Sequence, residues 1–176
     1  MSILKISITG PESSGKSELT KALAAEYNTS YAPEYARIYL EKTGGVYDYS
    51  DLTEIAKGQL KNEEKAIASA NGICFFDTDM LVFKVWAEFR FASVPELIES
   101  AFRQKRYDHY LLCKPDLEWQ ADPFRESPDQ SERDKLFEIY ISELEKLGAS
   151  YHIITGRGDN RLKSAVNFIT QKTKRG

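Results

Sequence analysis

The sequence predicts an α/β fold built on a mainly parallel sheet. Five short apolar runs alternate along the 176 residues with longer segments of helical periodicity, and this alternation is typical of βαβ units. Polar or glycine-rich turns follow several of these runs at the same end of the predicted strand. The length corresponds to one domain covering residues 1–176, and 41% hydrophobic and 29% charged residues are the composition of a chain with a real core.

The N-terminal half contains the first two predicted strands. The apolar run over residues 3–9 enters a glycine-rich turn, and the pattern over residues 19–27 predicts an amphipathic helix after it. A second short strand covers residues 30–32 and ends at Pro33, because proline has no N–H to donate to a ladder. A polar helix follows over residues 50–70.

The remaining three strands lie in the second half of the chain. The uninterrupted apolar run at residues 73–76 predicts a buried central strand, and the runs at 109–113 and 151–155 predict two more. Ser131 and Asp134 have the spacing of a capping box, so we expect a helix to begin at Ser131.

Charge and composition exclude several classes of protein. A formal net charge of −3 does not favour nucleic-acid backbones or anionic lipid surfaces. The chain has neither an 18-residue apolar stretch nor a secretory signal at its start, so we expect no membrane association and a cytoplasmic location. Cys74 and Cys113 lie inside apolar runs, and they are interpreted as buried thiols.

The strongest motif is Gly-Pro-Glu-Ser-Ser-Gly-Lys-Ser at residues 10–17, a P-loop that lies directly after a strand and opens a helix. Its glycines let successive amide N–H groups face inward, while Lys16 reaches the outer phosphates and the Ser17 hydroxyl is a hard ligand for Mg²⁺. The residues predicted to bind ATP phosphates are Gly10, Glu12, Ser13, Ser14, Gly15, Lys16 and Ser17.

A GTPase is a poorer interpretation of this P-loop. Cys113-Lys114-Pro115-Asp116 differs at its first position from the Asn/Thr-Lys-x-Asp segment that reads guanine. The sequence also has no Asp-x-x-Gly after the strand at residues 73–76, where a γ-phosphate sensor belongs.

Carboxylates follow two of the strands. Asp77 comes directly after a buried strand, so its side chain should lie beside the phosphate loop and reach either the metal or a substrate hydroxyl. Asp79 is a second functional carboxylate or the N-cap of the next helix. Glu34 and Arg37 would share a helix face toward the same crevice, unless they form a surface ion pair.

Residues 118–133 are predicted to form a lid. This segment is rich in charge and proline, and it carries Trp119, Asp122, Arg125 and Arg133 before any regular pattern begins. A closing loop with arginines can stabilise the charge of a transferred phosphoryl group and exclude water. The alternatives are a solvated loop and, for Trp119, an anchor for packing.

Five segments together resemble one known family. They read Gly-Pro-Glu-Ser-Ser-Gly-Lys-Ser at 10–17, Pro-Glu-Tyr-Ala-Arg at 33–37, Gly-Gln at 58–59, Phe-Phe-Asp-Thr-Asp at 75–79 and Glu-Trp-Gln-Ala-Asp-Pro-Phe-Arg at 118–125. The chain resembles, from about residue 4 to residue 170, the ribosylnicotinamide kinase domain of NadR-type NAD-salvage proteins. The resemblance implies a three-layer αβα P-loop kinase fold with a five-stranded parallel sheet.

The resemblance also implies roles for individual residues. Lys16, Asp77 and Arg125 would be catalytic, and Ser17 and Asp77 would bind Mg²⁺. Tyr31 would be the stacking platform where the family often has tryptophan. The residues expected to contact the nucleoside are Tyr31, Glu34, Arg37, Gln59, Asp77, Asp79, Trp119 and Asp122. The sequence leaves open whether Asp77 or Glu34 is the general base.

The functional hypothesis is therefore ATP-dependent phosphorylation of nicotinamide riboside to nicotinamide mononucleotide, with ATP and Mg²⁺. Another small-molecule or nucleoside kinase of the same fold and a non-kinase ATP-binding regulatory module are the alternatives. Family members often carry DNA-binding and adenylyltransferase domains before the kinase domain, whereas the P-loop here begins at residue 10. We therefore expect an adenylyltransferase partner to be a separate chain.

Overall fold

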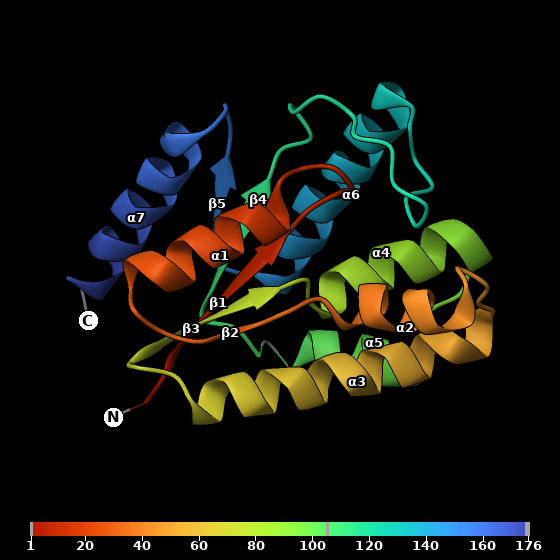
Figure 1. The fold of residues 1–176 in the computed structure, drawn as a ribbon, viewed down its shortest axis with the longest axis horizontal. Helices are drawn as coiled ribbons and strands as arrows, with labels where there is room; N and C mark the ends of the chain where they lie inside the picture. The colour runs from red at the N-terminus through yellow and green to blue at the C-terminus, as the bar shows by residue number, and fades with distance from the viewer. Residues whose placement is uncertain (1, 105, 175–176) are drawn as a thin grey trace.

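A computed structural model describes residues 2–104 and 106–174 and has at its centre a parallel five-stranded sheet with the order β2-β3-β1-β4-β5 (Figure 1). The strands are β1 (Leu4–Thr9), β2 (Tyr31–Ala32), β3 (Ile73–Asp77), β4 (His109–Cys113) and β5 (Tyr151–Ile154). The predicted α/β class and the five parallel strands are confirmed.

Helices cover both faces of the sheet, which gives three layers (Figure 1). The helices are α1 (Lys16–Glu26), α2 (Tyr35–Thr43), α3 (Tyr49–Ala68), α4 (Met80–Phe91), α5 (Glu96–Arg103), α6 (Gln130–Leu147) and α7 (Asp159–Thr173). Helices α1 and α7 pack with one face of the sheet, and buried residues from α2 to α6 form a larger cluster on the other.

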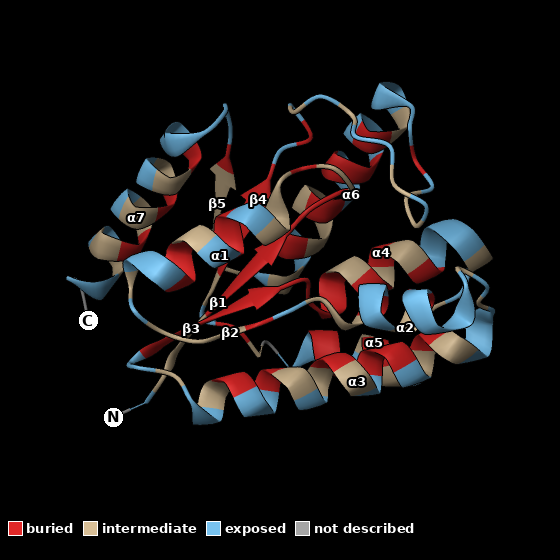
Figure 2. Ribbon diagram, in the orientation of Figure 1, coloured by how far each residue is buried: buried red, intermediate tan, exposed pale blue. Residues whose placement is uncertain are grey.

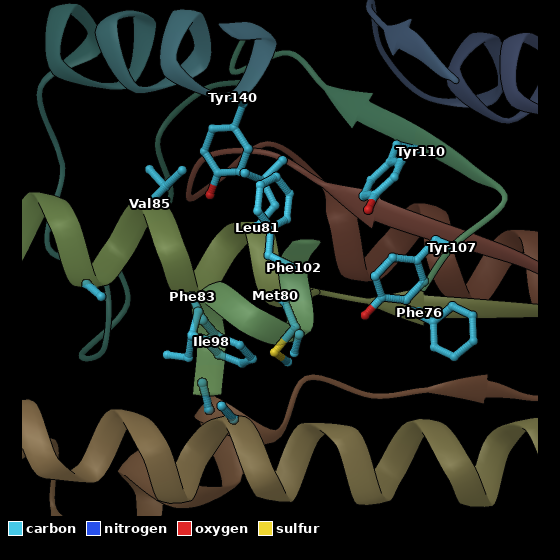
Figure 3. Close-up of a cluster of buried hydrophobic side chains, with 14 of the residues drawn as sticks. Phe76, Met80, Leu81, Phe83, Val85, Ile98, Phe102, Tyr107, Tyr110 and Tyr140 are labelled. Carbon is cyan, nitrogen blue, oxygen red and sulfur yellow. The ribbon is translucent and has the colours of Figure 1, made fainter. Parts of the chain in front are cut away.

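Successive side chains of a strand point to opposite faces of the sheet, and this alternation explains why the core is divided into two clusters. Phe75 packs in the cluster with α1 and α7, whereas its neighbour Phe76 packs in the cluster on the opposite face. All residues of β3 are buried, as expected for a strand covered on both faces (Figure 2). In the larger cluster Tyr107 lies beside Phe76, with 5.2 Å between ring centroids, and beside Tyr110 (Figure 3).

Helix α6 begins at Gln130, one residue before the predicted start at Ser131. Asp129 is its N-cap, and the carboxylate accepts the backbone N–H groups of Ser131 at 2.6 Å and Glu132 at 3.3 Å. Ser131 therefore lies within the first turn, and it does not form the capping box that was expected with Asp134. Aspartate and serine are both favoured N-cap residues, so the sequence alone did not distinguish Asp129 from Ser131.

The parallel topology places the carboxyl ends of the strands at one edge of the sheet, where the P-loop follows β1, Glu34 follows β2 and Asp77 ends β3. This edge is therefore the place to look for a site. Across the described residues, none of the helices combines the length and apolar character that crossing a bilayer requires.

Candidate active site

The P-loop adopts the shape that its glycines allow. Gly10 and Gly15 have φ angles of 134° and 77°, values that favour glycine. A Cβ atom on Gly10 would lie 2.6 Å from the backbone oxygen of Cys113 in the neighbouring strand. The loop thus passes too close to β4 for any side chain at this position, and Gly15 is the N-cap of α1.

The Lys16 side chain folds back onto the first residues of this loop. Its ammonium donates to the backbone oxygens of Gly10 and Pro11, both at 2.9 Å. The Ser14 hydroxyl also donates to the Pro11 oxygen, at 2.7 Å. The lysine charge is therefore held at the loop beside the start of helix α1, where backbone N–H groups and the helix dipole favour an anion.

Asp77 ends β3 directly beside the P-loop strand, opposite Ile8 of β1. The side chain is only 4% exposed, and its Oδ1 atom has no hydrogen-bond partner among the described residues. Burial raises the pKa of Asp77, while the Ser17 hydroxyl and the Lys16 charge oppose that shift. An unpartnered buried carboxylate oxygen facing a serine hydroxyl is a donor set that fits Mg²⁺.

This pair does not form a complete metal site by itself. The described residues contain no cluster of three or more histidine, cysteine, aspartate or glutamate side chains placed to hold a metal ion. A small number of protein ligands is normal for Mg²⁺ in phosphoryl-transfer sites, where substrate phosphates and water supply the other oxygens.

Glu34 is the residue before α2 and faces the same region from the other side. Its carboxyl group does not cap the helix. Burial raises the pKa of Glu34, and the charge of Asp77 raises it further, against the charges of Lys16 and Arg37. Glu34 thus lies close enough to Lys16 and Asp77 to be coupled with both.

Two clefts meet at Lys16 and Glu34. The first has a volume of about 180 Å³ and is lined by the P-loop, by Glu34 and Arg37, and by lid residues that include Asp122 and Arg125. The second has a volume of about 110 Å³ and extends from the P-loop between α4, α6 and the lid. Both clefts are lined by Glu12, Lys16, Glu34, Ala36, Leu40 and Phe124.

The second cleft, hereafter the aromatic pocket, has six aromatic residues in its lining. The aromatic residues are Tyr47, Phe83, Trp86, Phe89, Phe124 and Tyr140. Trp86 Nε1 donates to the Tyr47 hydroxyl at 3.0 Å, and that hydroxyl donates to Glu126 Oε1 at 2.9 Å. The Tyr47 and Trp86 rings are 4.8 Å apart and tilted by 56°. The pocket therefore has a hydrogen-bonded aromatic wall with a carboxylate at its edge.

The segment predicted as a lid contacts the P-loop. Glu12 Oε2 accepts the backbone N–H groups of Glu126 at 2.9 Å and Ser127 at 3.0 Å. Ser13 Oγ lies 3.3 Å from the backbone nitrogen of Gln120 and 3.5 Å from Arg125. The segment thus lies over the P-loop rather than extending into solvent.

Three further contacts shape this segment. Arg37 forms an ion pair with Asp122, which connects α2 to the lid. The guanidinium groups of Arg125 and Arg133 lie 5.8 Å and 4.9 Å from the centre of the Trp119 ring. Trp119 lines neither cleft and packs instead against these arginines.

Four other predicted substrate contacts line neither cleft: Asp77, described above, and three more. Tyr31 packs in the cluster with α1 and α7, on the opposite face of the sheet from the aromatic pocket. Asp79 is fully buried, caps α4 through Val82, and accepts the hydroxyl groups of Ser7 at 2.6 Å and Thr9 at 3.1 Å. Gln59 is also fully buried and bonded to backbone groups.

Sequence reasoning did not identify the aromatic pocket. Val82, Trp86 and Phe89 recur at helical spacing on α4, which is a visible signal. That spacing is equally typical of a helix packing into a core, so it did not distinguish a pocket wall from a core face.

Known proteins resemble this chain in sequence and in fold. A family model described as an AAA domain matches residues 5–161. The trifunctional NAD biosynthesis/regulator protein NadR of Salmonella typhimurium is 27% identical over 171 residues, and NadR of Escherichia coli is 30% identical over 145 residues. These alignments cover 94% and 80% of this chain but only 42% and 35% of those proteins.

Solved structures show the same fold. A NadR crystal structure in complex with NR has a TM-score of 0.82 at 24% identity, and covers 96% of this chain and 51% of that one. Thymidylate kinase from Ehrlichia chaffeensis has a TM-score of 0.62 at 13% identity, with 97% and 98% coverage. The resemblance to NadR and the P-loop kinase fold are thereby confirmed, and the chain belongs to the AAA-domain family of P-loop proteins that the model over residues 5–161 describes.

Proposed function

We propose that this P-loop kinase transfers the γ-phosphoryl group of ATP to the 5′-hydroxyl of nicotinamide riboside and so forms nicotinamide mononucleotide. The observation that carries the proposal is the aromatic pocket, which shares Lys16 and Glu34 with the P-loop cleft. An acceptor in that pocket would place its hydroxyl next to the phosphates. NadR, whose alignment covers 94% of this chain and 42% of NadR itself, has been crystallised in complex with NR.

The chemistry of the pocket suits a cationic ring. Its lining combines aromatic faces with the carboxylates of Glu12, Glu34 and Glu126. Among the described residues that line it, Lys16 is the one cation, and it lies at the P-loop end. Aromatic faces attract cations, and the positively charged pyridine of nicotinamide riboside meets both features. A neutral base would gain stacking alone.

The two carboxylates have different positions, and we assign them different roles. Glu34 lines both clefts, so it is placed to accept the proton of the 5′-hydroxyl. Asp77 lines neither cleft and lies behind the P-loop, where with Ser17 it would hold Mg²⁺. When bound, Mg²⁺ neutralises charge on the β- and γ-phosphates.

The proposed transfer is a single displacement. The acceptor oxygen forms a bond to the γ-phosphorus, the bond from that phosphorus to the β,γ-bridging oxygen breaks, and ADP leaves with the electron pair. The acceptor proton goes to Glu34. Lys16 and Arg125, which both line the P-loop cleft, balance the charge of the transferred group.

The lid would serve this step by excluding water. Residues 118–133 contact the P-loop through Glu12 and Ser13, and we propose that they close over the bound substrates as part of one kinase domain. We further propose that an adenylyltransferase uses the mononucleotide product, since the relatives are named as trifunctional NAD biosynthesis proteins.

The test is the rate of ATP consumption by the purified chain with Mg²⁺ and a panel of nucleosides. We expect turnover with nicotinamide riboside and much slower turnover with deoxyadenosine. The deoxyadenosine kinase of the same fold makes this nucleoside the relevant competitor. Turnover with another acceptor and none with nicotinamide riboside would overturn the substrate assignment.

A non-kinase regulatory module makes a different prediction for two variants. Lys16→Ala should abolish ATP binding in either case. Asp77→Asn should nearly abolish turnover in a kinase, whereas a module that only binds ATP should keep its biological effect in this variant.

A further inference from the structure

One glutamine contacts the two backbone segments that carry the proposed carboxylates. Gln59 lies on α3 and is fully buried. Its Oε1 atom accepts the backbone N–H of Tyr35 at 2.8 Å, and its Nε2 atom donates to the backbone oxygen of Thr78 at 3.3 Å. Tyr35 follows Glu34, and Thr78 follows Asp77.

The bond to Tyr35 supports the start of α2. Glu34 occupies the N-cap position without a side-chain capping bond, so it leaves the first N–H groups of the helix to other acceptors. Gln59 supplies one such acceptor. Gly58 makes the approach possible, because a Cβ atom there would lie 2.1 Å from the Tyr35 ring.

The bond to Thr78 holds a strained residue. Thr78 has a φ of 75°, which is rare for a β-branched side chain. The backbone N–H of Thr78 donates to the backbone oxygen of Ile8 at 3.2 Å. The backbone oxygen of Thr78 accepts the bond from Gln59. This turn directs Asp79 inward to Ser7 and Thr9 while Asp77 lies beside the P-loop. Strain of this kind persists only where the surroundings impose it.

We infer that Gln59 is a positioning residue that fixes Glu34 and Asp77 relative to each other. Both bonds come from one side chain without exposed surface, so one amide orients the segment of the proposed base and the segment of the proposed metal ligand. The inference rests on the proposed function for the roles of these two carboxylates. The opposing view is that Gln59 only satisfies two backbone groups and contributes stability.

Gln59→Met removes both bonds and nearly preserves the volume. We expect kcat to fall by about 10- to 100-fold, a loss that small misplacements of reacting groups produce. The KM values for ATP and for the acceptor should change by less than about threefold, because Gln59 lines neither cleft. A variant that loses only thermal stability and keeps kcat would overturn the inference.

Ile55→Val is the matched control. Ile55 is a fully buried residue on the same helix, and its side chain packs in the cluster with α2 to α6. This variant should lower Tm and leave kcat unchanged. An equal loss of kcat in Ile55→Val would mean that any weakening of α3 impairs turnover, which contradicts a specific role for Gln59.

Glycine at position 78 provides a rescue test. Glycine adopts a φ of 75° without the penalty that threonine pays, so Thr78→Gly should reduce the dependence of the turn on Gln59. In the Thr78→Gly background, we expect Gln59→Met to lower kcat by only about threefold, because contacting residues are coupled. The same fold-loss in both backgrounds would show that Gln59 does not act through Thr78.

A measurement without substrates separates this inference from the proposed function. Amide hydrogen exchange by NMR should be at least about tenfold faster at Tyr35 in Gln59→Met, and unchanged there in Ile55→Val. Unchanged exchange in Gln59→Met would refute the positioning role even if nicotinamide riboside is the acceptor. Absence of turnover with this nucleoside would refute only the substrate.

Discussion

The carboxylate of Glu12 accepts the backbone N–H of Ser127 at 3.0 Å, although 115 positions separate the two residues in the sequence. The same oxygen also accepts the N–H of Glu126 at 2.9 Å. Sequence reasoning assigned Glu12 to phosphate binding together with its P-loop neighbours. Phosphate binding through the backbone N–H of Glu12 stays a prediction, and the contacts of its carboxylate indicate that this side chain anchors the lid to the P-loop.

Removing this anchor should loosen the lid without unfolding the protein. In Glu12→Ala we expect amide exchange at Glu126 and Ser127 to become at least about tenfold faster, since hydrogen bonds to charged groups contribute about 1.5–3 kcal/mol. The KM for the acceptor should rise, because Glu126 and Ser127 line the aromatic pocket. Glu64→Ala, at an exposed glutamate on α3, is the control and should change neither quantity. Unaltered exchange at both amides in Glu12→Ala would disprove the anchoring role.

The pH dependence of kcat/KM should report Glu34. Burial and the charge of Asp77 raise its pKa, and a general base acts only when ionised. Activity should therefore fall as the pH is lowered through this raised pKa, at a higher pH than an ordinary glutamate would give. Glu34→Gln should remove the acid limb and lower kcat by about 10²- to 10⁴-fold. Persistence of the limb in this variant would assign the base to Asp77.

Charge recognition in the aromatic pocket should depend on Trp86. We expect Trp86→Leu to raise the KM for nicotinamide riboside about tenfold, because cation–π attraction contributes about 0.5–2 kcal/mol. The KM for ATP should not change, since Trp86 lines only the aromatic pocket. The neutral dihydro form of the nucleoside is the matched ligand. It should bind the original protein more weakly than the cationic form does, and it should lose less affinity in the variant. Equal effects on both nucleosides would mean that the pocket does not recognise charge.

Stability should depend on pH through Glu63, a buried carboxyl group on α3 that lines neither cleft. Burial raises the pKa of Glu63 from 4.5 to about 7, against the hydroxyl of Tyr107 at 2.7 Å and the charge of Arg106. Between pH 4.5 and about 7, the Glu63 carboxyl group is therefore protonated in the folded protein and ionised in the unfolded chain. That stabilisation is complete below pH 4.5 and is lost as the pH rises through about 7.

Glu63→Gln tests this linkage, because glutamine still accepts the Tyr107 hydroxyl and carries no charge. The free energy of unfolding should exceed that of the original protein by up to about 3 kcal/mol at pH 8, and the difference should shrink toward pH 5. Urea unfolding at several pH values measures it. A difference independent of pH would contradict the titration of Glu63.

Much of the fold followed from local sequence patterns. The P-loop and β3 can be recognised in the sequence. The glycine spacing of the P-loop and the uninterrupted apolar run of a fully buried strand are both signals contained within a few residues. Asp77 was placed correctly beside the P-loop for the same reason, since parallel strands end at one edge.

The acceptor side could not be found in this way. Tyr31 and Ala32 are neighbours in β2, and a shift of one position moves a side chain to the other face of the sheet. Tyr31 therefore faces α1 and α7, on the side away from the aromatic pocket. The rings of Tyr47, Trp86 and Tyr140 meet only after α4, α6 and the loop between α2 and α3 have packed, so no local pattern predicts their meeting.

The wall common to the two clefts constrains how specificity can change. A substitution at Glu12, Lys16 or Glu34 alters both clefts at once, because each residue lines both. Tyr47 and Trp86 line the aromatic pocket alone. If the aromatic pocket holds the acceptor as proposed, selection or design for a new acceptor can therefore act on Tyr47 and Trp86 alone. A change at any of the three shared residues would also alter the cleft at the P-loop, and with it the binding of ATP.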